Sequence, residues 1–188
     1  LAVVLVANAA RLKPTPVLDP LPPSAAAGDD AAVERFRALL RIPTVWDLRN
    51  PDVDRTAFDG FVPALRRLYP AVFEACELEL IDGRGISLLW KGANRELAPI
   101  VLMAHHDVVD ADPVGWTHDP FAADIDDGRI YARGAVDTKC VWAGLMEAAE
   151  RLIAEGFTPP RDVYFFSSNN EEDGGEMAPH RVEHLQRI

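Results

Sequence analysis

The chain is poor in cysteine and in positive charge, and each deficit excludes a class of protein. Only Cys76 and Cys140 are cysteines among its 188 residues, so the sequence offers neither a disulfide framework nor a CxxC-type zinc site. Acidic residues outnumber basic ones by 30 to 19, which leaves a formal net charge of −11. Because negative charge repels nucleic acid and anionic membrane surfaces, we expect neither as a partner.

Long hydrophobic runs are also lacking. The apolar run at residues 1–10 (LAVVLVANAA) is shorter than the roughly 20 residues that span a bilayer. It fits the tail of a membrane anchor, the remnant of an export signal, or a short buried element; the first two would mean that the protein is membrane-anchored or exported. Residues 13–24 contain five prolines and are typical of an extended linker. We therefore assign residues 1–27 to an apolar segment with a proline-rich linker, and residues 28–188 to the folded part.

The folded part alternates between helical and strand patterns. Helices are expected at residues 31–42, 54–69 and 139–155, and strands at residues 72–81, 86–90, 99–105, 128–135 and 162–168. Such alternation is typical of an α/β fold, and we predict a mostly parallel sheet with helices on both faces. In sheets of this kind, functional sites form beyond the carboxyl ends of the strands.

Two imidazoles and a carboxylate follow the predicted strand at residues 99–105. Residues i and i+2 of a strand point the same way, so His105 and Asp107 share a face and His106 faces away from it. An imidazole that binds a metal usually donates its second N–H to a carboxylate. His105 and Asp107 therefore suit a metal ligand and its supporting acid.

Acidic residues follow two further predicted strands, Asp137 after residues 128–135 and the pair Glu171 and Glu172 after residues 162–168. One aspartate can bridge two metal ions, and of two adjacent glutamates one can bind metal while the other takes a proton from water. Asp137 has a rival role as the N-cap of the helix expected to follow it, and one side chain would hardly fill both roles.

Four carboxylates that converged without a cation would repel one another, and some would stay protonated. A divalent metal removes that conflict. Imidazole and carboxylate ligands favour zinc, with manganese and cobalt as alternatives. Two ions about 3.5–4 Å apart would polarise a carbonyl group and activate a water molecule.

Three segments resemble a known family in their order and spacing. They are MAHHDVVD (103–110), GWTHDPFAADIDDGRIYARGAVDTK (115–139) and the run that ends in SSNNEEDGG (167–175). Together they resemble the co-catalytic zinc exopeptidases, a family that includes carboxypeptidase S, aminoacylase, carboxypeptidase G and succinyl-diaminopimelate desuccinylase. The resemblance is strongest to the carboxypeptidase S branch.

This resemblance implies a role for each candidate residue. His105 would be a zinc ligand braced by Asp107, Asp137 would bridge the two zinc ions, and Glu172 would bind the second ion. Glu171 would be the general base, and the peptide bond after Asp137 would be cis. The implied reaction is hydrolysis of an amide bond in a small peptide or an N-acyl amino acid with a free carboxylate.

The resemblance also implies parts that would lie beyond Ile188. They are one further ligand for each metal ion and a smaller domain that helps to bind substrate and to form a homodimer. We therefore interpret residues 28–188 as the N-terminal portion of a metallopeptidase catalytic domain, and expect this chain alone to be inactive. Four residues depart from the usual pattern of the family without removing a ligand: Asp110, Ala132, Thr138 and Asn170.

Two alternatives remain open. The residues from His180 to His184 (HRVEH) match H-x-x-E-H, the zinc motif of another protease class, with two imidazoles one helical turn apart. A solvated helix face explains the same pattern. The chain is alternatively a catalytically incomplete fragment or binding module of the same fold, although all five candidate site positions are intact.

Overall fold

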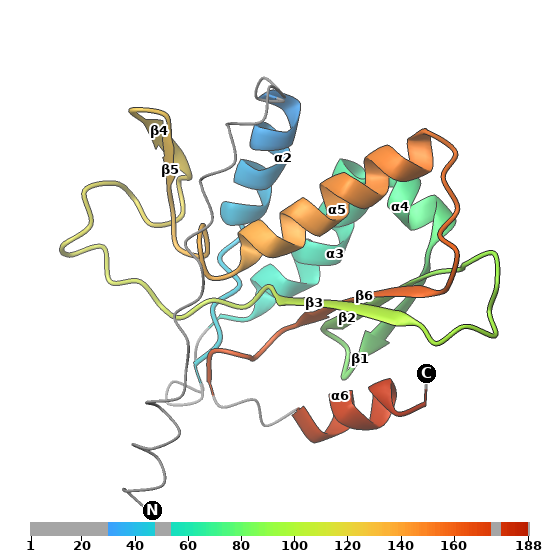
Figure 1. Ribbon diagram of the computed structural model, residues 1–188. Helices are drawn as coiled ribbons and strands as arrows, with labels where there is room; N and C mark the ends of the chain where they lie inside the picture. Colours follow the sequence, from blue (N-terminus) through green and yellow to red (C-terminus); the bar gives the residue numbers. More distant parts are fainter. Residues whose placement is uncertain (1–29, 48–53, 174–177, 188) are drawn as a thin grey trace, which may run out of the picture.

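The computed structural model describes residues 30–47, 54–173 and 178–187, and shows a four-stranded sheet with helices packed on it (Figure 1). The predicted α/β class is confirmed. In chain order the elements are α2 (Asp30–Leu40), α3 (Thr56–Leu68), α4 (Pro70–Ala75), β1 (Glu77–Ile81), β2 (Gly85–Trp90), β3 (Ile100–His105), β4 (Asp124–Asp126), β5 (Arg129–Tyr131), α5 (Lys139–Ala154), β6 (Val163–Ser168) and α6 (Ala178–Leu185).

The main sheet has the strand order β1-β2-β6-β3, and its parallel pair is β3 with β6. β1 and β2 form an antiparallel hairpin, and β2 is also antiparallel to β6. The sheet is therefore mixed, whereas a mostly parallel one was expected. The reason is the short turn between β1 and β2, since a connection of a few residues joins antiparallel neighbours while parallel ones need a long crossover. β4 and β5 form a separate small sheet, which shortens the strand expected at residues 128–135.

The register of β3 against β6 determines where the functional side chains emerge. His105, the last residue of β3, lies opposite Ser168, the last residue of β6. The two strands are parallel, so their carboxyl ends meet at one edge of the sheet. The residues that follow each strand are thereby brought together although more than 60 positions separate them along the chain.

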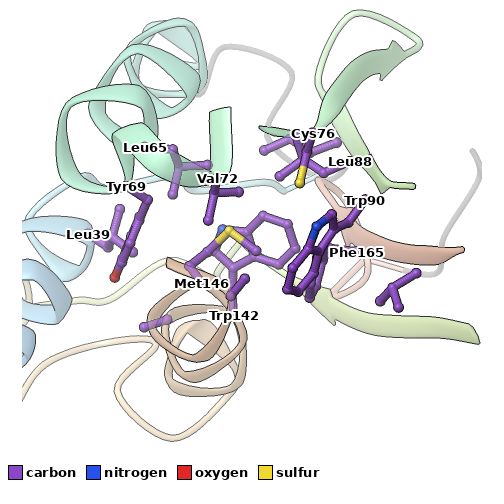
Figure 2. Packing of buried hydrophobic residues seen from close by; sticks show 14 of the residues in the cluster. Leu39, Leu65, Tyr69, Val72, Cys76, Leu88, Trp90, Trp142, Met146 and Phe165 are labelled. Atoms are coloured by element: carbon purple, nitrogen blue, oxygen red, sulfur yellow. The ribbon is translucent and has the colours of Figure 1, made fainter. Parts of the chain in front are cut away.

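The hydrophobic core fills the space between the sheet and the helices α3, α4 and α5 (Figure 2). Trp142 and Met146 of α5 are fully buried there, together with Leu65 of α3 and with Leu88 and Phe165 of the sheet. Burial of each such side chain contributes about 1.5–3 kcal/mol to folding. This packing holds α5, and with it the turn that precedes α5, against β6 and β3.

Helices lie on both faces of the sheet, as predicted. Successive side chains of β6 point to opposite faces, so Phe165 enters the core while Phe166 faces α6. The rings of Phe166 and His184 have centroids 6.3 Å apart. In Figure 1, α6 lies on the side of the sheet opposite α3 and α5.

Part of the strand predicted at residues 72–81 is helical instead, because α4 ends at Ala75 and only β1 is extended. The main-chain N–H groups of Ala71 and Val72 donate to the Glu150 carboxylate of α5, at 3.1 and 2.9 Å. A carboxylate at a helix N-terminus satisfies amides that have no partner within the helix and interacts favourably with the helix dipole.

The prediction of export or membrane anchoring through the N-terminal apolar segment is wrong when judged by whether a helix could cross a membrane. Within the described part of the chain, the helices are all too short or too polar to cross a membrane. Residues 1–27, on which the prediction was based, lie outside the described residues.

Candidate metal centre

His105 stands at the centre of the polar cluster at this sheet edge. Its Nε2 atom lies 3.1 Å from Oδ1 of Asp137, and its Nδ1 atom lies 3.1 Å from the main-chain oxygen of Asp107. The Asp107 carboxylate oxygen Oδ1 is 3.5 Å from the same Nδ1. With the proton on Nδ1 and donated toward Asp107, Nε2 presents a lone pair toward the other acids.

Asp107 connects the segment that follows β3 to the segment that follows β6. It is fully buried, and its Oδ2 accepts a hydrogen bond of 3.0 Å from the main-chain N–H of Glu172. Burial alone would raise the pKa of Asp107, but hydrogen bonds from His105 and from the amides of Glu172 and Glu171 lower it below its ordinary value. Asp107 therefore remains an anion that accepts hydrogen bonds from His105 and from the segment after β6.

The acids also affect the proton affinity of the imidazole. Burial disfavours the charged ring of His105, but its hydrogen bond to Asp107 and the charges of Asp107 and Glu171 outweigh this effect and raise its pKa to about 9. The surroundings of His105 are thus strongly attractive to positive charge, whether that charge is a proton or a metal ion.

Asp137 lies in the turn before α5, and its peptide bond to Thr138 is cis, as the family resemblance implied. The N-cap residue of α5 is Thr138, so the rival assignment of Asp137 as the N-cap is wrong. The Asp137 side chain is 75% exposed and contacts His105 instead.

The two glutamates, Glu171 and Glu172, follow β6 and bring a third segment of the chain to the cluster. Oε2 of Glu171 lies 3.7 Å from Nε2 of His105, and the Glu171 side chain is 60% exposed. Burial and the neighbouring charge of Asp137 raise the pKa of Glu172. Ligand atoms of His105, Asp137 and Glu172 all lie within 4.8 Å of one another, which makes these three a group able to hold a metal ion.

His106 points away from this cluster, as the strand alternation predicted. Its ring stacks on Phe61 with centroids 4.6 Å apart, and its Nδ1 lies 2.8 Å from the hydroxyl oxygen of Ser167. Both contacts are on the core side of β3. His106, the second of the two adjacent imidazoles, therefore has a structural role.

The H-x-x-E-H alternative is not supported by the arrangement of α6. His180 pairs with Asp82 at 3.1 Å, whereas the buried His184 has Nε2 3.1 Å from the hydroxyl of Ser87 and Nδ1 3.4 Å from Glu79. The two imidazoles thus have different partners, and in the described part of the chain the grouping able to hold a metal is the one around His105.

An apolar pocket of about 500 Å³ adjoins the cluster. Its lining combines site residues with hydrophobic side chains of β3, α5, β6 and α6, namely Met103, Ala104, His105, Asp137, Thr138, Val141, Phe166, Ser168, Glu171, Val182 and Leu185. The hydrophobic members were not singled out from the sequence. The strand periodicity could have identified one of them, since Met103 precedes His105 by two strand positions.

Comparisons with known sequences place these residues in a recognised context. Residues 101–187 match the profile of peptidase family M20/M25/M40. The chain is 35% identical over 156 residues to N-fatty-acyl-amino acid synthase/hydrolase PM20D1.1 of Danio rerio, a match that spans 81% of this chain and 30% of that protein. It is 38% identical over 153 residues to aminoacylase-1 of Sus scrofa, which spans 80% of this chain and 36% of the relative. The chain thus spans about a third of the length of these curated relatives.

A solved structure shares the fold. Human carnosine dipeptidase 1 superposes with a TM-score of 0.65 at 20% sequence identity, over 84% of this chain and 35% of that chain. At this level of identity the likeness concerns the arrangement of helices and strands.

Proposed function

Because this chain belongs to peptidase family M20/M25/M40, we propose that it forms part of a metal-dependent hydrolase that cleaves an amide bond in a small peptide or an N-acyl amino acid. The names of its relatives, an aminoacylase and an N-fatty-acyl-amino acid synthase/hydrolase, support this substrate class. The observation that carries the proposal is the approach of His105, Asp137 and Glu172 from three separate segments.

The donor set suits a divalent cation. One imidazole and two carboxylates are ligands that zinc takes at catalytic sites. Burial and, after it, the charge of Asp137 raise the pKa of Glu172, and a cation would relieve the part that comes from neighbouring negative charge. In this proposal His105, Asp137 and Glu172 would hold zinc, with manganese or cobalt as alternatives, and Asp137 would serve both of the two ions of the complete site.

Two further residues would serve the reaction without binding metal. The main-chain oxygen of Asp107 accepts from Nδ1 of His105, the Asp107 carboxylate lies 3.5 Å from the same nitrogen, and together they would direct Nε2 toward the ligand cluster. Glu171 is the general base in this proposal, since its exposed carboxylate lies at the same cluster and can accept a proton from water. When bound, the metal would polarise the scissile carbonyl and lower the pKa of a water molecule.

The apolar pocket suggests how a substrate would lie. An amide placed at His105 and Asp137 would have its acyl group or apolar side chain next to Met103, Val141 and Phe166. Burial of that group would supply binding energy remote from the reacting bond.

The organisation of the whole protein is part of the same proposal. Residues 28–188 would form the N-terminal portion of a catalytic domain, because the relatives are about three times as long as the matched segment. The remaining metal ligands and a domain that forms a homodimer would be supplied by other parts of the full-length protein, without which this segment would be inactive.

Elemental analysis of the full-length protein, with and without Asp137→Ala, tests the proposal. We expect about two zinc equivalents per wild-type chain, a loss of metal in the variant, and hydrolysis of N-acyl amino acids by the wild type alone. Asp112→Asn is the control, because Asp112 is exposed and accepts a local hydrogen bond from Val114. Unchanged metal content in Asp137→Ala would contradict the proposal, and metal binding without hydrolysis would favour a binding module.

A further inference from the structure

Lys139, the first residue of α5, is a charged side chain that the proposed reaction does not use. It is fully buried, two residues after Asp137. Its Nζ donates to two main-chain oxygens, 2.6 Å from that of Ile42 and 3.2 Å from that of Leu39. Both belong to the end of α2 and the turn after it.

The main chain of Lys139 closes the turn that carries Asp137. Its N–H donates to the carbonyl oxygen of Gly134 at 3.1 Å, so that Asp137 lies inside the turn. Gly134 has a positive φ of 83°, and a Cβ atom there would lie 2.9 Å from Val108 and 3.3 Å from the Lys139 side chain. The turn is therefore packed tightly between Lys139 and the segment that follows β3.

The segment held by Lys139 also contacts residues 106–108, which follow β3 directly after His105 and include Asp107. The Thr44 hydroxyl donates to the main-chain oxygen of His106, and the Thr44 carbonyl accepts from the N–H of Val108 at 2.9 Å. Trp46 adds a third bond, from its N–H to the Val108 carbonyl at 3.1 Å. Residues 39–46 thus accept hydrogen bonds from Lys139 at one end and are hydrogen-bonded to His106 and Val108 at the other.

We propose that Lys139 is a positioning residue that fixes the distance between Asp137 and His105 through residues 39–46. This inference rests on the proposed function, because it assumes that Asp137 and His105 bind the same metal cluster. A buried ammonium group is costly unless it is well paired. Here two carbonyl oxygens accept from Nζ and the face of the Phe61 ring lies 5.6 Å from it, so that these contacts hold Nζ at one defined place.

The test compares Lys139→Met with Lys91→Met in the full-length protein. Methionine keeps the length and apolar character of the lysine stem but cannot donate to Leu39 and Ile42. Lys91 is a matched control, since it is about half exposed and pairs with Glu77 away from the site. Zinc affinity is measured by chelator competition, and the ligand geometry by the absorption spectrum of the cobalt-substituted protein, both well below each variant's unfolding temperature.

We expect Lys139→Met to bind zinc about 10- to 100-fold more weakly and to alter the cobalt spectrum, while Lys91→Met matches the wild type. A folded Lys139→Met protein with wild-type affinity and spectrum would overturn the inference and leave Lys139 a purely stabilising residue. If this variant does not fold, Thr44→Val is used instead, because it removes the hydroxyl donor at the other end of the connection, and unchanged zinc affinity there overturns the inference equally. Wild-type protein without zinc affinity would contradict the proposed function itself.

Discussion

Nε2 of His105 lies 3.1 Å from Oδ1 of Asp137, although the two residues are 32 positions apart in the chain. Their approach results from two packing arrangements, the parallel pairing of β3 with β6 and the docking of α5 on the sheet. The imidazole is nearly buried and the carboxylate is largely exposed, so the contact lies at the surface of the sheet edge, where acids surround the ring.

Glu171→Gln and Glu172→Gln should separate catalysis from metal binding in the full-length protein. Because Glu171 is assigned as the base, its amide variant should keep its zinc but lose about 100- to 10,000-fold in kcat. Because Glu172 is assigned as a ligand, its amide variant should lose zinc. Metal analysis and steady-state kinetics on the same preparations give both quantities, and an identical response of the two variants would contradict the division of roles.

Substrates with longer acyl groups should be hydrolysed faster. Each methylene buried in the apolar pocket contributes about 0.8 kcal/mol, or roughly fourfold in kcat/KM, until the pocket is filled. Val141→Asp places a charge in the pocket lining and should reduce the preference for N-dodecanoyl over N-acetyl amino acids. Val114→Asp is the control, because Val114 is 84% exposed and is not among the lining residues. Equal preference in all three proteins would exclude the pocket as the acyl site.

Two glycine-to-alanine substitutions should have opposite effects on stability. A Cβ atom at Gly92 would lie 2.1 Å from the carbonyl carbon of Arg161, so Gly92→Ala must displace main chain and should cost at least about 1–3 kcal/mol. Gly144 lies within α5 with nothing near its Cβ position, and Gly144→Ala should stabilise by about 0.5–1 kcal/mol. Urea unfolding measures both. A neutral Gly92→Ala would mean that the connection between β2 and β3 lies farther from Arg161.

The two thiols should differ strongly in reactivity. Burial raises the pKa of Cys76 to about 12, whereas Cys140 is partly exposed in the first turn of α5. Iodoacetamide at pH 8 should therefore label Cys140 in the folded protein and reach Cys76 only after unfolding, with mass spectrometry reporting each site. The variant Cys140→Ser should then react slowly throughout. Rapid labelling of Cys76 in this variant would show that the core opens between α4 and β1.

The approach of the candidate ligands could be predicted from the sequence, because it follows from the strand pattern of each segment and from the rule that parallel strands end at one edge of a sheet. The apolar run before His105 identifies a strand, and the alternation of side chains separates His105 and Asp107 from His106. Parallel strands end at one edge, which brings Glu171 and Glu172 toward the same place. The roles assigned to these residues remain predictions.

Features that depend on distant partners were not predictable in this way. The helical start of α4 is stabilised by Glu150, which lies 78 positions beyond Val72, and an alternating pattern shows no sign of it. Lys139 reaches carbonyl oxygens about 100 positions earlier in the chain, and its own segment shows no sign of them. In both cases a side chain of α5 forms hydrogen bonds with main-chain groups of a neighbouring helix or turn. Only the tertiary arrangement determines which main-chain groups these are.

The pairing of β3 with β6 decides which of two adjacent imidazoles is available for chemistry. A slip of one residue would turn His106 toward the pocket and His105 toward Phe61, since neighbouring side chains in a strand project to opposite sides. The ring stacking of His106 on Phe61 and its contact with Ser167 oppose that exchange. Which imidazole faces the candidate site therefore depends on the contacts of His106, and substitutions on the core side of this strand can change the side that faces the pocket.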